Sequence, residues 1–350
     1  MENSKNKLIQ ISGVSIGQGH PCYVIAEIGI NHNGDITIAK KLIDAAVNAG
    51  ANAVKFQKRN LDSLYLEHIL ENPNVESQGL EILLDVLNTV ELKDSDYREI
   101  IQYCNEKNIT FLCTAWDTKS VDFLESLDIP AYKIASADLT NFPLIQYICK
   151  TKKPIIISSG MSTLDEIERT VNFLNEKESN FILLHSNSTY PSPTELLNLS
   201  LIPFLNEKFH LPIGYSGHEQ GIIPSVTAVT LGAVIIERHI TLDKTMSGID
   251  QSSSLEPLEF AQLIKFIREA EKSIGNPIKK MTRGEILQRE VLGKSIVSKA
   301  DIVKGETFTL NNIEVKGPSK GITPQYFFQL LGKKSNRSIQ KGSYILDDDL

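Results

Sequence analysis

Eight short apolar runs recur along residues 23–239, and each ends in side chains that can take part in polar chemistry. The runs are YVIAE (23–27), AVKFQK (53–58), TFLCTAW (110–116), AYKIAS (131–136), PIIISSG (154–160), FILLHS (181–186), PIGYSGH (212–218) and VIIERH (234–239). Near-continuous apolar runs are typical of parallel strands that are buried on both faces. In a (β/α)8 barrel the working residues gather at the carboxyl ends of such strands. The pattern therefore predicts an α/β fold, a (β/α)8 TIM barrel, with an active site on one rim.

The segments between the runs have the periodicity and the end signals of helices. Residues 37–49 carry one apolar face, and Gly50 follows as a stop. Thr163 and Glu166 have the spacing of a capping box before a helical stripe. Pro257 stands where a first-turn proline belongs. Alternating strands and helices favour parallel βαβ units.

A change of pattern near residue 284 predicts a second, β-rich domain. LGKSIVSKADIVKGETFTLNNI (292–313) is echoed by LGKKSNRSIQKGSYILDDDL (331–350), with Leu-Gly-Lys and Ile-x-Lys-Gly in both. We therefore expect a barrel domain of residues 1–283 and a small domain of residues 284–350 with internal pseudo-symmetry. Residues 58–93 are too long for a simple βα connection, so we expect either a lid or a packing decoration there, with a short helix at EILLDVLNTV.

Composition excludes several classes of protein. A net charge of −7 argues against a nucleic-acid binder, and no run reaches the roughly 20 apolar residues of a membrane span. The N-terminal segment MENSKNKLIQIS has no secretory signal pattern. The scattered Cys22, Cys104, Cys113 and Cys149 form no CxxC spacing and suggest reduced cysteines of a cytoplasmic protein.

Two lysines, Lys55 and Lys133, lie in apolar strand runs and are expected near the barrel mouth. A buried lysine is costly unless it is paired, so a structural ion pair is one interpretation of each. Two lysines on one rim, with the hydroxyls of Thr114, Ser136 and Ser158 nearby, also suit a polyanion such as phosphate.

Histidines His218 and His239 each follow a strand run, and the two runs are expected to be adjacent. Imidazoles on neighbouring strand ends can share a divalent metal ion, although a lone histidine here is more often structural. With Glu27 and Glu237 they predict a mixed nitrogen and oxygen site for Mn²⁺ or Mg²⁺ rather than a closed zinc site. Glu27 and Asp138 are also candidate general acids or bases.

These residues fall in blocks that resemble the sialic acid synthase family. The blocks are AEIGINHNGD (26–35), VKFQK (54–58), YKIAS (132–136), SSGM (158–161), TYP (189–191), GYSGHE (214–219), ERHITLDKT (237–245) and SGIDQSSSLEP (247–257). The last sixty residues resemble the antifreeze-like SAF domain, a β-clip fold. The resemblance implies a transferase that condenses phosphoenolpyruvate with N-acetylmannosamine or its 6-phosphate, giving N-acetylneuraminate or its 9-phosphate. Legionaminic, pseudaminic and KDN-type acids are alternative products.

The resemblance also implies roles for single residues. Phosphoenolpyruvate would be bound by Lys55, Thr114, Lys133, Ser136, Ser158 and Ser216. The sugar would face Gln57, Asp138, Tyr190 and Asp250. His218 and His239 would hold Mn²⁺, Mg²⁺ or Co²⁺, Glu27 would transfer a proton, and Lys55 and Lys133 would stabilise the charge that moves. In the family the SAF domain closes the partner's active site, which implies a domain-swapped homodimer.

Three departures bear on the sugar. Asp138 stands where many bacterial members carry Glu, Ser188 replaces an Asn of bacterial N-acetylmannosamine users, and Gly317 replaces an Arg that reaches the partner's site. The blocks GYSGHE and PSKG look like the animal type, which uses the 6-phosphate, and Lys320 or Lys58 and Arg59 are candidates to meet such a phosphate. Two rival hypotheses remain: a Schiff-base aldolase using a barrel lysine, and a non-catalytic role of the C-terminal domain.

Overall fold

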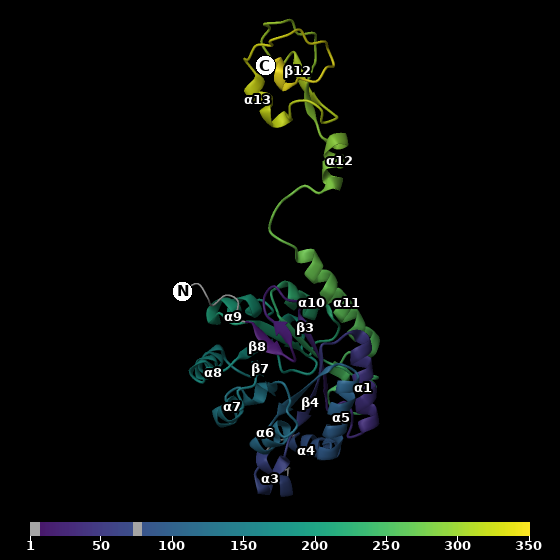
Figure 1. Ribbon diagram of the computed structural model, residues 1–350, viewed down its shortest axis with the longest axis vertical. Coiled ribbons are helices and arrows are strands. Elements are labelled where there is room, and N and C mark those ends of the chain that lie inside the picture. The colour runs from purple at the N-terminus through teal and green to yellow at the C-terminus, as the bar shows by residue number, and fades with distance from the viewer. Residues whose placement is uncertain (1–7, 73–78) are drawn as a thin grey trace. The chain divides into compact units, whose positions relative to one another are not determined.

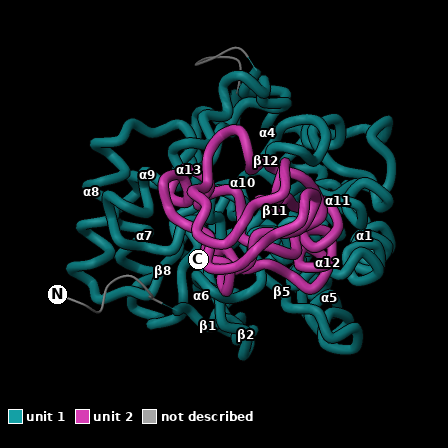
Figure 2. The backbone as a smooth tube through the Cα atoms, turned by 90° about the horizontal axis from the view of Figure 1, so that it is seen from above, with its two compact units in different colours: residues 1–275 teal, residues 276–350 magenta. Residues whose placement is uncertain are grey.

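The computed structural model describes residues 8–72 and 79–350, and these fall into two compact units. The first unit comprises residues 1–275 and the second residues 276–350, coloured separately in Figure 2. The domain boundary predicted from the sequence, at 283/284, falls in the second unit at the start of helix α12 (Arg283–Leu292).

Within the described residues of the first unit, eight parallel strands close into a barrel in the order β10-β3-β4-β5-β6-β7-β8-β9. The strands are β3 (Tyr23–Gly29), β4 (Ala53–Lys58), β5 (Thr110–Ala115), β6 (Tyr132–Ile134), β7 (Ile155–Ser158), β8 (Phe181–Ser186), β9 (Ile213–Gly217) and β10 (Ile235–His239). All eight coincide with the apolar runs of the sequence, so the predicted TIM barrel is confirmed.

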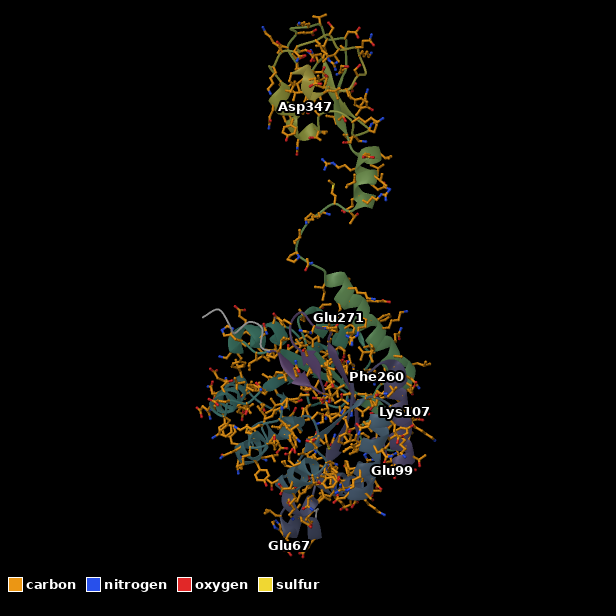
Figure 3. The ribbon with its side chains drawn as sticks, viewed as in Figure 1. Glu67, Glu99, Lys107, Phe260, Glu271 and Asp347 are labelled. Atoms are coloured by element: carbon orange, nitrogen blue, oxygen red, sulfur yellow. The ribbon has the colours of Figure 1, made fainter. Side chains whose placement is uncertain are left out.

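Helices surround the barrel strands, as Figure 1 shows. They are α1 (Ile36–Ala49), α5 (Asp94–Glu106), α6 (Thr118–Glu125), α7 (Phe142–Cys149), α8 (Leu164–Glu176), α9 (Leu201–Phe209), α10 (Ile223–Thr230) and α11 (Pro257–Ile274). The predicted end signals are present: Gly50 ends α1 with φ 86°, and Thr163 and Glu166 form the capping box of α8. Phe260 of α11 is fully buried, whereas Glu99 of α5 lies at the outer surface (Figure 3).

Two apolar clusters follow from the alternation of side chains along the strands. Residues that point outward, such as Val54 and Phe56, pack with the surrounding helices. Residues that point inward near the strands' amino ends form a second cluster, which we call the barrel floor. It contains Ile25, Ala53, Leu112, Ala131, Ile156, Ile182, Leu184 and Ile235, together with Ile9, Ile11 and Ile16. Those last three come from an N-terminal hairpin, β1 (Ile9–Ile11) and β2 (Val14–Ile16), which the sequence analysis missed.

The insertion after β4 contains α2 (Leu61–Leu64), α3 (Glu67–Glu71) and α4 (Leu80–Val90), so the helix predicted at 81–90 is confirmed. Residues 73–78 of the predicted 58–93 insertion lie outside the described residues. At its base the insertion is fixed to the barrel, because Lys58 Nζ lies 3.0 Å from Glu91 Oε1. None of the helices in the described part of the chain has the length and hydropathy that spanning a bilayer would require.

The second unit has its own small core and the predicted pseudo-symmetry. Its strands β11 (Ser295–Ser298) and β12 (Ile313–Lys316) pair antiparallel, and its short helix α13 spans Phe327–Leu330. The isoleucines of the repeated Ile-x-Lys-Gly motif, Ile302 and Ile339, exchange two backbone hydrogen bonds of 2.8 Å with each other. Both side chains are buried in the core of this unit. The sequence repeat therefore corresponds to a structural one.

Candidate active site

A cavity of about 240 Å³ opens at the carboxyl ends of the barrel strands. Eleven of the residues predicted from the sequence line it: Glu27, Lys55, Gln57, Thr114, Lys133, Ser136, Ser158, Tyr190, Ser216, His218 and His239. They come together because inward positions alternate along each strand. Lys55 lies two residues beyond Ala53 of the floor, and Ser158 lies two beyond Ile156. The two predicted lysines and the two predicted histidines thus share one cavity.

Lys55 is the more constrained of the two lysines. Its Nζ lies 2.9 Å from Glu27 Oε2 and 3.7 Å from Glu237 Oε1, and it donates to Thr114 Oγ1 at 2.9 Å. Burial opposes the charge on Lys55, but Glu237 and Glu27 outweigh it and raise the pKa of the amine. Lys55 is therefore held as a cation inside a buried ion-pair cluster.

Lys133 is equally buried, with 3% of its surface exposed, but it forms no ion pair with any carboxylate of residues 8–72 and 79–350. Its Nζ donates to Ser158 Oγ at 2.6 Å and to the carbonyl oxygen of Ile134 at 2.9 Å. Burial lowers the pKa of Lys133 to about 8; the charge of Glu237 partly opposes this shift, and the charge of Lys55 adds to it. A buried cation bonded only to neutral oxygens is prepared to receive an anion.

Further hydroxyl groups, and one backbone amide bonded to one of them, lie in or against the wall of the same cavity. Ser136 Oγ accepts a hydrogen bond of 3.1 Å from the backbone N–H of Gly160. Gly160 has no room for a side chain, because a Cβ there would lie 2.1 Å from Ser188 Oγ and 2.8 Å from Ser136 Oγ. The loop after β7 therefore brings its backbone directly against the polar wall of the cavity.

Glu27 is oriented by two neighbours. Its Oε2 pairs with Lys55, and its Oε1 accepts from Gln57 Nε2 at 2.9 Å. Glu237, which the sequence analysis named only as a metal neighbour, reaches the same cluster and accepts from Ser216 Oγ at 3.2 Å. Its second oxygen, Oε2, is buried without a hydrogen-bond partner among the described residues. The cavity thus contains two carboxylates in different environments.

The two histidines fit a divalent metal ion by the chemistry of their nitrogens. Nδ1 of His218 lies 2.8 Å from the carbonyl oxygen of Asn187 and must donate to it, which leaves a lone pair on Nε2, 2.9 Å from the Tyr190 hydroxyl. Burial chiefly, with a contribution from His239, lowers the pKa of His218 to about 3, so this imidazole is neutral. Nδ1 of His239 is buried with no hydrogen-bond partner in the described chain, and the two rings are 5.5 Å apart.

Two imidazoles are too few ligands for a closed site. Within residues 8–72 and 79–350, no group of three or more His, Cys, Asp or Glu side chains is arranged to hold an ion. Water and a substrate oxygen would have to complete the coordination of a metal ion held by His218 and His239.

Two of the predicted site residues, Asp138 and Asp250, are not among the residues that line the cavity. Asp138 lies in a short 3₁₀ turn, Ser136–Asp138, where Oδ1 accepts from Asn141 Nδ2 at 2.9 Å and Oδ2 is buried without a partner in the described chain. Burial raises its pKa, and Asp117 adds to the shift. Asp250 lies at the edge, with Oδ2 3.8 Å from His239 Nδ1.

Sequence reasoning missed a buried ion pair next to the histidines. Arg238 and Glu219 are both fully buried, with Arg238 Nη1 2.7 Å from Glu219 Oε1. Tyr215 and Ser225 also donate to the Glu219 carboxylate. Because Arg238 alternates with Glu237 and His239, it points to the outer side of the barrel, and the pair joins β10 to the segment between β9 and α10. The alternation of side chains along a strand could have predicted that Arg238 points outward, but it could not have identified Glu219 as its partner.

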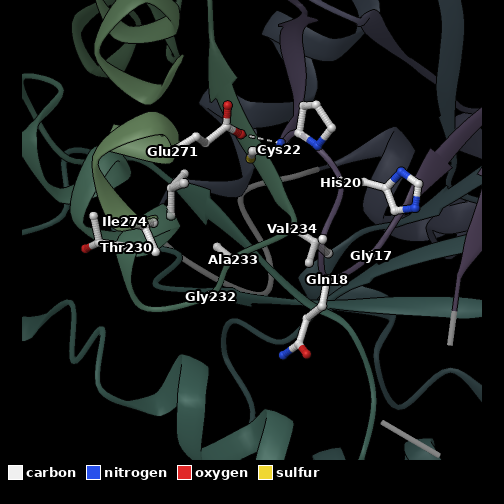
Figure 4. A pocket seen from close by; sticks show the side chains of 13 residues that line it. Gly17, Gln18, His20, Cys22, Thr230, Gly232, Ala233, Val234, Glu271 and Ile274 are labelled. Carbon is white, nitrogen blue, oxygen red and sulfur yellow. Dashed lines mark hydrogen bonds between the residues drawn. The ribbon is translucent and has the colours of Figure 1, made fainter. Parts of the chain in front are cut away.

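A cavity of about 520 Å³ lies at the opposite end, beside the amino ends of β3 and β10 (Figure 4). Its only carboxylate among the described lining residues, Glu271, already accepts from the Cys22 backbone N–H and from Arg268. His20 lies on its wall. This cavity has no lysine or arginine in its described lining. It also lacks the convergent polar groups that line the cavity at the carboxyl ends of the strands.

Comparisons with known proteins agree with the geometry. Residues 42–279 match the NeuB family, and residues 293–350 match the SAF domain. N-acetylneuraminate-9-phosphate synthase of Mus musculus is 39% identical over 96% of this chain and 94% of its own. N,N'-diacetyllegionaminic acid synthase of Campylobacter jejuni is 40% identical over 92% of this chain and 98% of its own. The sialic acid synthetase of Leptospira borgpetersenii, solved in complex with citrate, superposes with a TM-score of 0.72 and 34% identity over 81% of this chain and 95% of its own.

Proposed function

The chain belongs to the NeuB family of synthases, and we propose that it condenses phosphoenolpyruvate with N-acetylmannosamine or its 6-phosphate, releasing phosphate. The product would be N-acetylneuraminate or its 9-phosphate. Lys133 is the observation that carries the proposal, because it is a buried cation with no ion-pair partner in the described chain, bonded to one hydroxyl and one backbone carbonyl. A small substrate with a phosphate and a carboxylate supplies the missing negative charge.

Phosphoenolpyruvate would bind with its anionic groups on Lys133, Lys55 and the hydroxyls of Thr114, Ser136 and Ser158. Its C3 attacks the aldehyde carbon of the open-chain sugar, which leaves positive charge at C2. Water adds to C2, and the tetrahedral intermediate then loses phosphate by cleavage of the C2–O bond. Lys133 and Lys55 stay close to the phosphate throughout and stabilise the negative charge that develops on it.

Glu27 would hold and transfer a proton during this reaction. Lys55 and Gln57 fix both of its oxygens, so its carboxylate is oriented before substrate binds. The proton comes from the water that attacks C2 or goes to the hydroxyl that forms from the aldehyde. Glu237, with one unpartnered oxygen, is the second carboxylate near the reacting atoms.

His218 and His239 would hold Mn²⁺ or Mg²⁺. When bound, such an ion supplies Lewis-acid polarisation of the sugar carbonyl. Tyr190 is placed to orient the sugar oxygen on the same side, because its hydroxyl already contacts His218. The predicted domain-swapped homodimer and the cytoplasmic location remain predictions.

A panel assay of phosphate release tests this function. The full-length protein is incubated with phosphoenolpyruvate and, in turn, N-acetylmannosamine, its 6-phosphate, mannose 6-phosphate and a diacetamido-hexose, and each product is identified by mass. We expect phosphate release with one of the two N-acetylmannosamine substrates. Turnover with the diacetamido sugar alone would instead identify a legionaminic-type synthase, the activity named for the Campylobacter jejuni relative.

A Schiff-base aldolase is the second candidate, because burial lowers the pKa of Lys133 toward the range in which a lysine is nucleophilic. Borohydride would then trap a substrate carbon on Lys133, and chelators would not affect turnover. The condensation proposed above predicts no adduct and loss of activity in EDTA.

A further inference from the structure

Arg59, directly after β4, is a buried cation that the reaction described above does not use. Only 5% of its surface is exposed, yet its guanidinium forms no ion pair with a carboxylate of residues 8–72 and 79–350. Its Nη1 is buried and has no hydrogen-bond partner among those residues. An unpaired buried charge is strongly unfavourable in a folded protein, so such a group calls for a partner that the chain itself does not supply.

The neighbouring Lys58, in contrast to Arg59, is paired. Lys58 Nζ lies 3.0 Å from Glu91 and 3.4 Å from Asp94, so its charge is neutralised within the fold. Glu91 meets Arg59 only at the backbone, where its Oε1 lies 3.5 Å from the Arg59 N–H. The carboxylates of the insertion therefore form ion pairs with Lys58 but none with the guanidinium, on which the charge of Glu91 acts from a longer distance.

Arg59 is joined to the active-site cavity by two contacts. Its Nη2 donates to Gln57 Oε1, and Gln57 in turn donates to Glu27. Its guanidinium carbon lies 5.4 Å from the centre of the Trp116 ring, in a cation–π contact. Gln57 and Trp116 both line the cavity. Arg59 therefore lies directly behind two residues of the cavity wall, on the side of β4 and β5.

We propose that Arg59 binds the phosphate group of a phosphorylated hexosamine acceptor and so selects that substrate over the unphosphorylated sugar. This inference rests on the proposed function. In an open-chain hexose 6-phosphate the reacting aldehyde and the phosphate are at opposite ends, so the phosphate must extend out of the reacting centre. The planar N–H groups of a guanidinium match phosphate oxygens, and a site held by Trp116 and Gln57 needs little ordering on binding.

The test uses the full-length protein, wild type and Arg59→Gln, with N-acetylmannosamine and its 6-phosphate as paired acceptors. We expect the wild type to prefer the 6-phosphate. In R59Q the KM for the 6-phosphate should rise at least about 30-fold, whereas the KM for the unphosphorylated sugar should change less than about threefold. Arg59→Lys keeps the charge but loses the planar donor pair, so its KM for the 6-phosphate should lie between those of the wild type and R59Q. If R59Q does not fold, Arg59→Lys takes its place in the test. Arg98→Gln, the same substitution at an exposed arginine of α5, is the matched control, and its ratio of the two KM values should equal that of the wild type.

Calorimetric titration separates the possible outcomes. R59Q should bind phosphoenolpyruvate with a dissociation constant close to that of the wild type, because Lys133 holds that substrate. Weaker binding of phosphoenolpyruvate in R59Q would overturn the inference. An equal loss of kcat with both acceptors would also overturn it, and would make Arg59 a positioning residue for Gln57 only. If the wild type releases no phosphate with any hexosamine, the proposed function fails, while titration of the 6-phosphate into wild type and R59Q still tests Arg59.

Discussion

The floor and the mouth of the barrel are built by the same strands and the same inward alternation, but they have opposite chemistry. At the floor, Ile25, Ile156 and Ile182 are buried among apolar neighbours. Two residues further along β3 and β7, the inward positions are Glu27 and Ser158. The step from Ala131, directly before β6, to Lys133 within it crosses the same boundary. On these strands, the inward side chains near the amino end pack in the apolar floor, and those near the carboxyl end are polar.

The difference has an energetic meaning. Burying the floor side chains contributes roughly 25 cal/mol for each Å² of apolar surface removed from water. Each charged group at the mouth instead loses hydration, which costs several kcal/mol unless a partner compensates. Lys55 forms an ion pair with Glu27, whereas Lys133 has no ion pair among the described residues and its more distant carboxylates do not offset its burial. The floor therefore stabilises the fold, and the mouth retains binding capacity at the expense of stability.

The largest expected effect comes from the histidines of the mouth. We expect His239→Ala to reduce kcat by about 10³-fold or more, because a metal ion's Lewis-acid contribution is worth several kcal/mol. EDTA should inactivate the wild type, and Mn²⁺ should restore it but should not restore the variant. His20→Ala, a histidine beside the floor, is the control and should be unaffected. Full wild-type activity in EDTA would reject the metal assignment.

Removing the free cation tests the anion site of the mouth. Lys133→Met should raise the KM for phosphoenolpyruvate roughly 100-fold and change the KM of the sugar by less than about threefold, since a buried charged contact is worth 2–5 kcal/mol. Steady-state kinetics with each substrate varied in turn measures this. Lys153→Met removes a lysine already paired with Glu125 and Asp128 and should leave both constants unchanged. Equal losses for the two substrates would count against the role of Lys133.

The lowered pKa of Lys133 predicts a pH dependence. Below about pH 8 the amine is protonated and can bind the phosphoenolpyruvate anion; above it, the charge is lost. The substrate phosphate is already doubly ionised there, because its second pKa is near 6. We expect kcat/KM for phosphoenolpyruvate to fall about tenfold for each pH unit above this value. Lys133→Arg, which stays protonated, should abolish the fall, and a wild-type profile that remains flat to pH 9.5 would contradict the assignment.

The smallest effect is expected at the floor. Ile182→Val removes one methylene from a fully buried position and should lower the free energy of unfolding by about 1 kcal/mol. Thermal or urea unfolding measures the change. Because Ile182 lies below the cavity, kcat and both KM values should stay the same. A clear change in the KM for phosphoenolpyruvate would show that packing of the floor and geometry of the mouth are coupled. The two ends of the barrel would then not have separate roles.

Much of the fold could be predicted from local patterns. The eight apolar runs became the eight strands, because a strand buried on both faces requires such a run. Gly50 and the Thr163–Glu166 capping box marked helix ends, because their backbone and side-chain preferences act over a few residues. The repeated Ile-x-Lys-Gly motif became two equivalent, mutually bonded segments. The N-terminal hairpin escaped notice, since its strands have only three residues each.

The sequence by itself determined which side chains reach the mouth, because a strand's period of two and its parallel direction follow from local spacing. It did not determine which of them would be paired. Pairing of β3 with β4 sets Glu27 opposite Lys55, and closure of the barrel, which places β10 beside β3, adds Glu237, while Lys133 is left without an ion pair among the described residues. The same holds for Lys58 and Arg59, which are adjacent in sequence but differ because Glu91 forms an ion pair with the side chain of Lys58 only and meets Arg59 at the backbone. Ion pairing depends on distances of a few Å between segments far apart in the chain, and tertiary structure alone sets those distances.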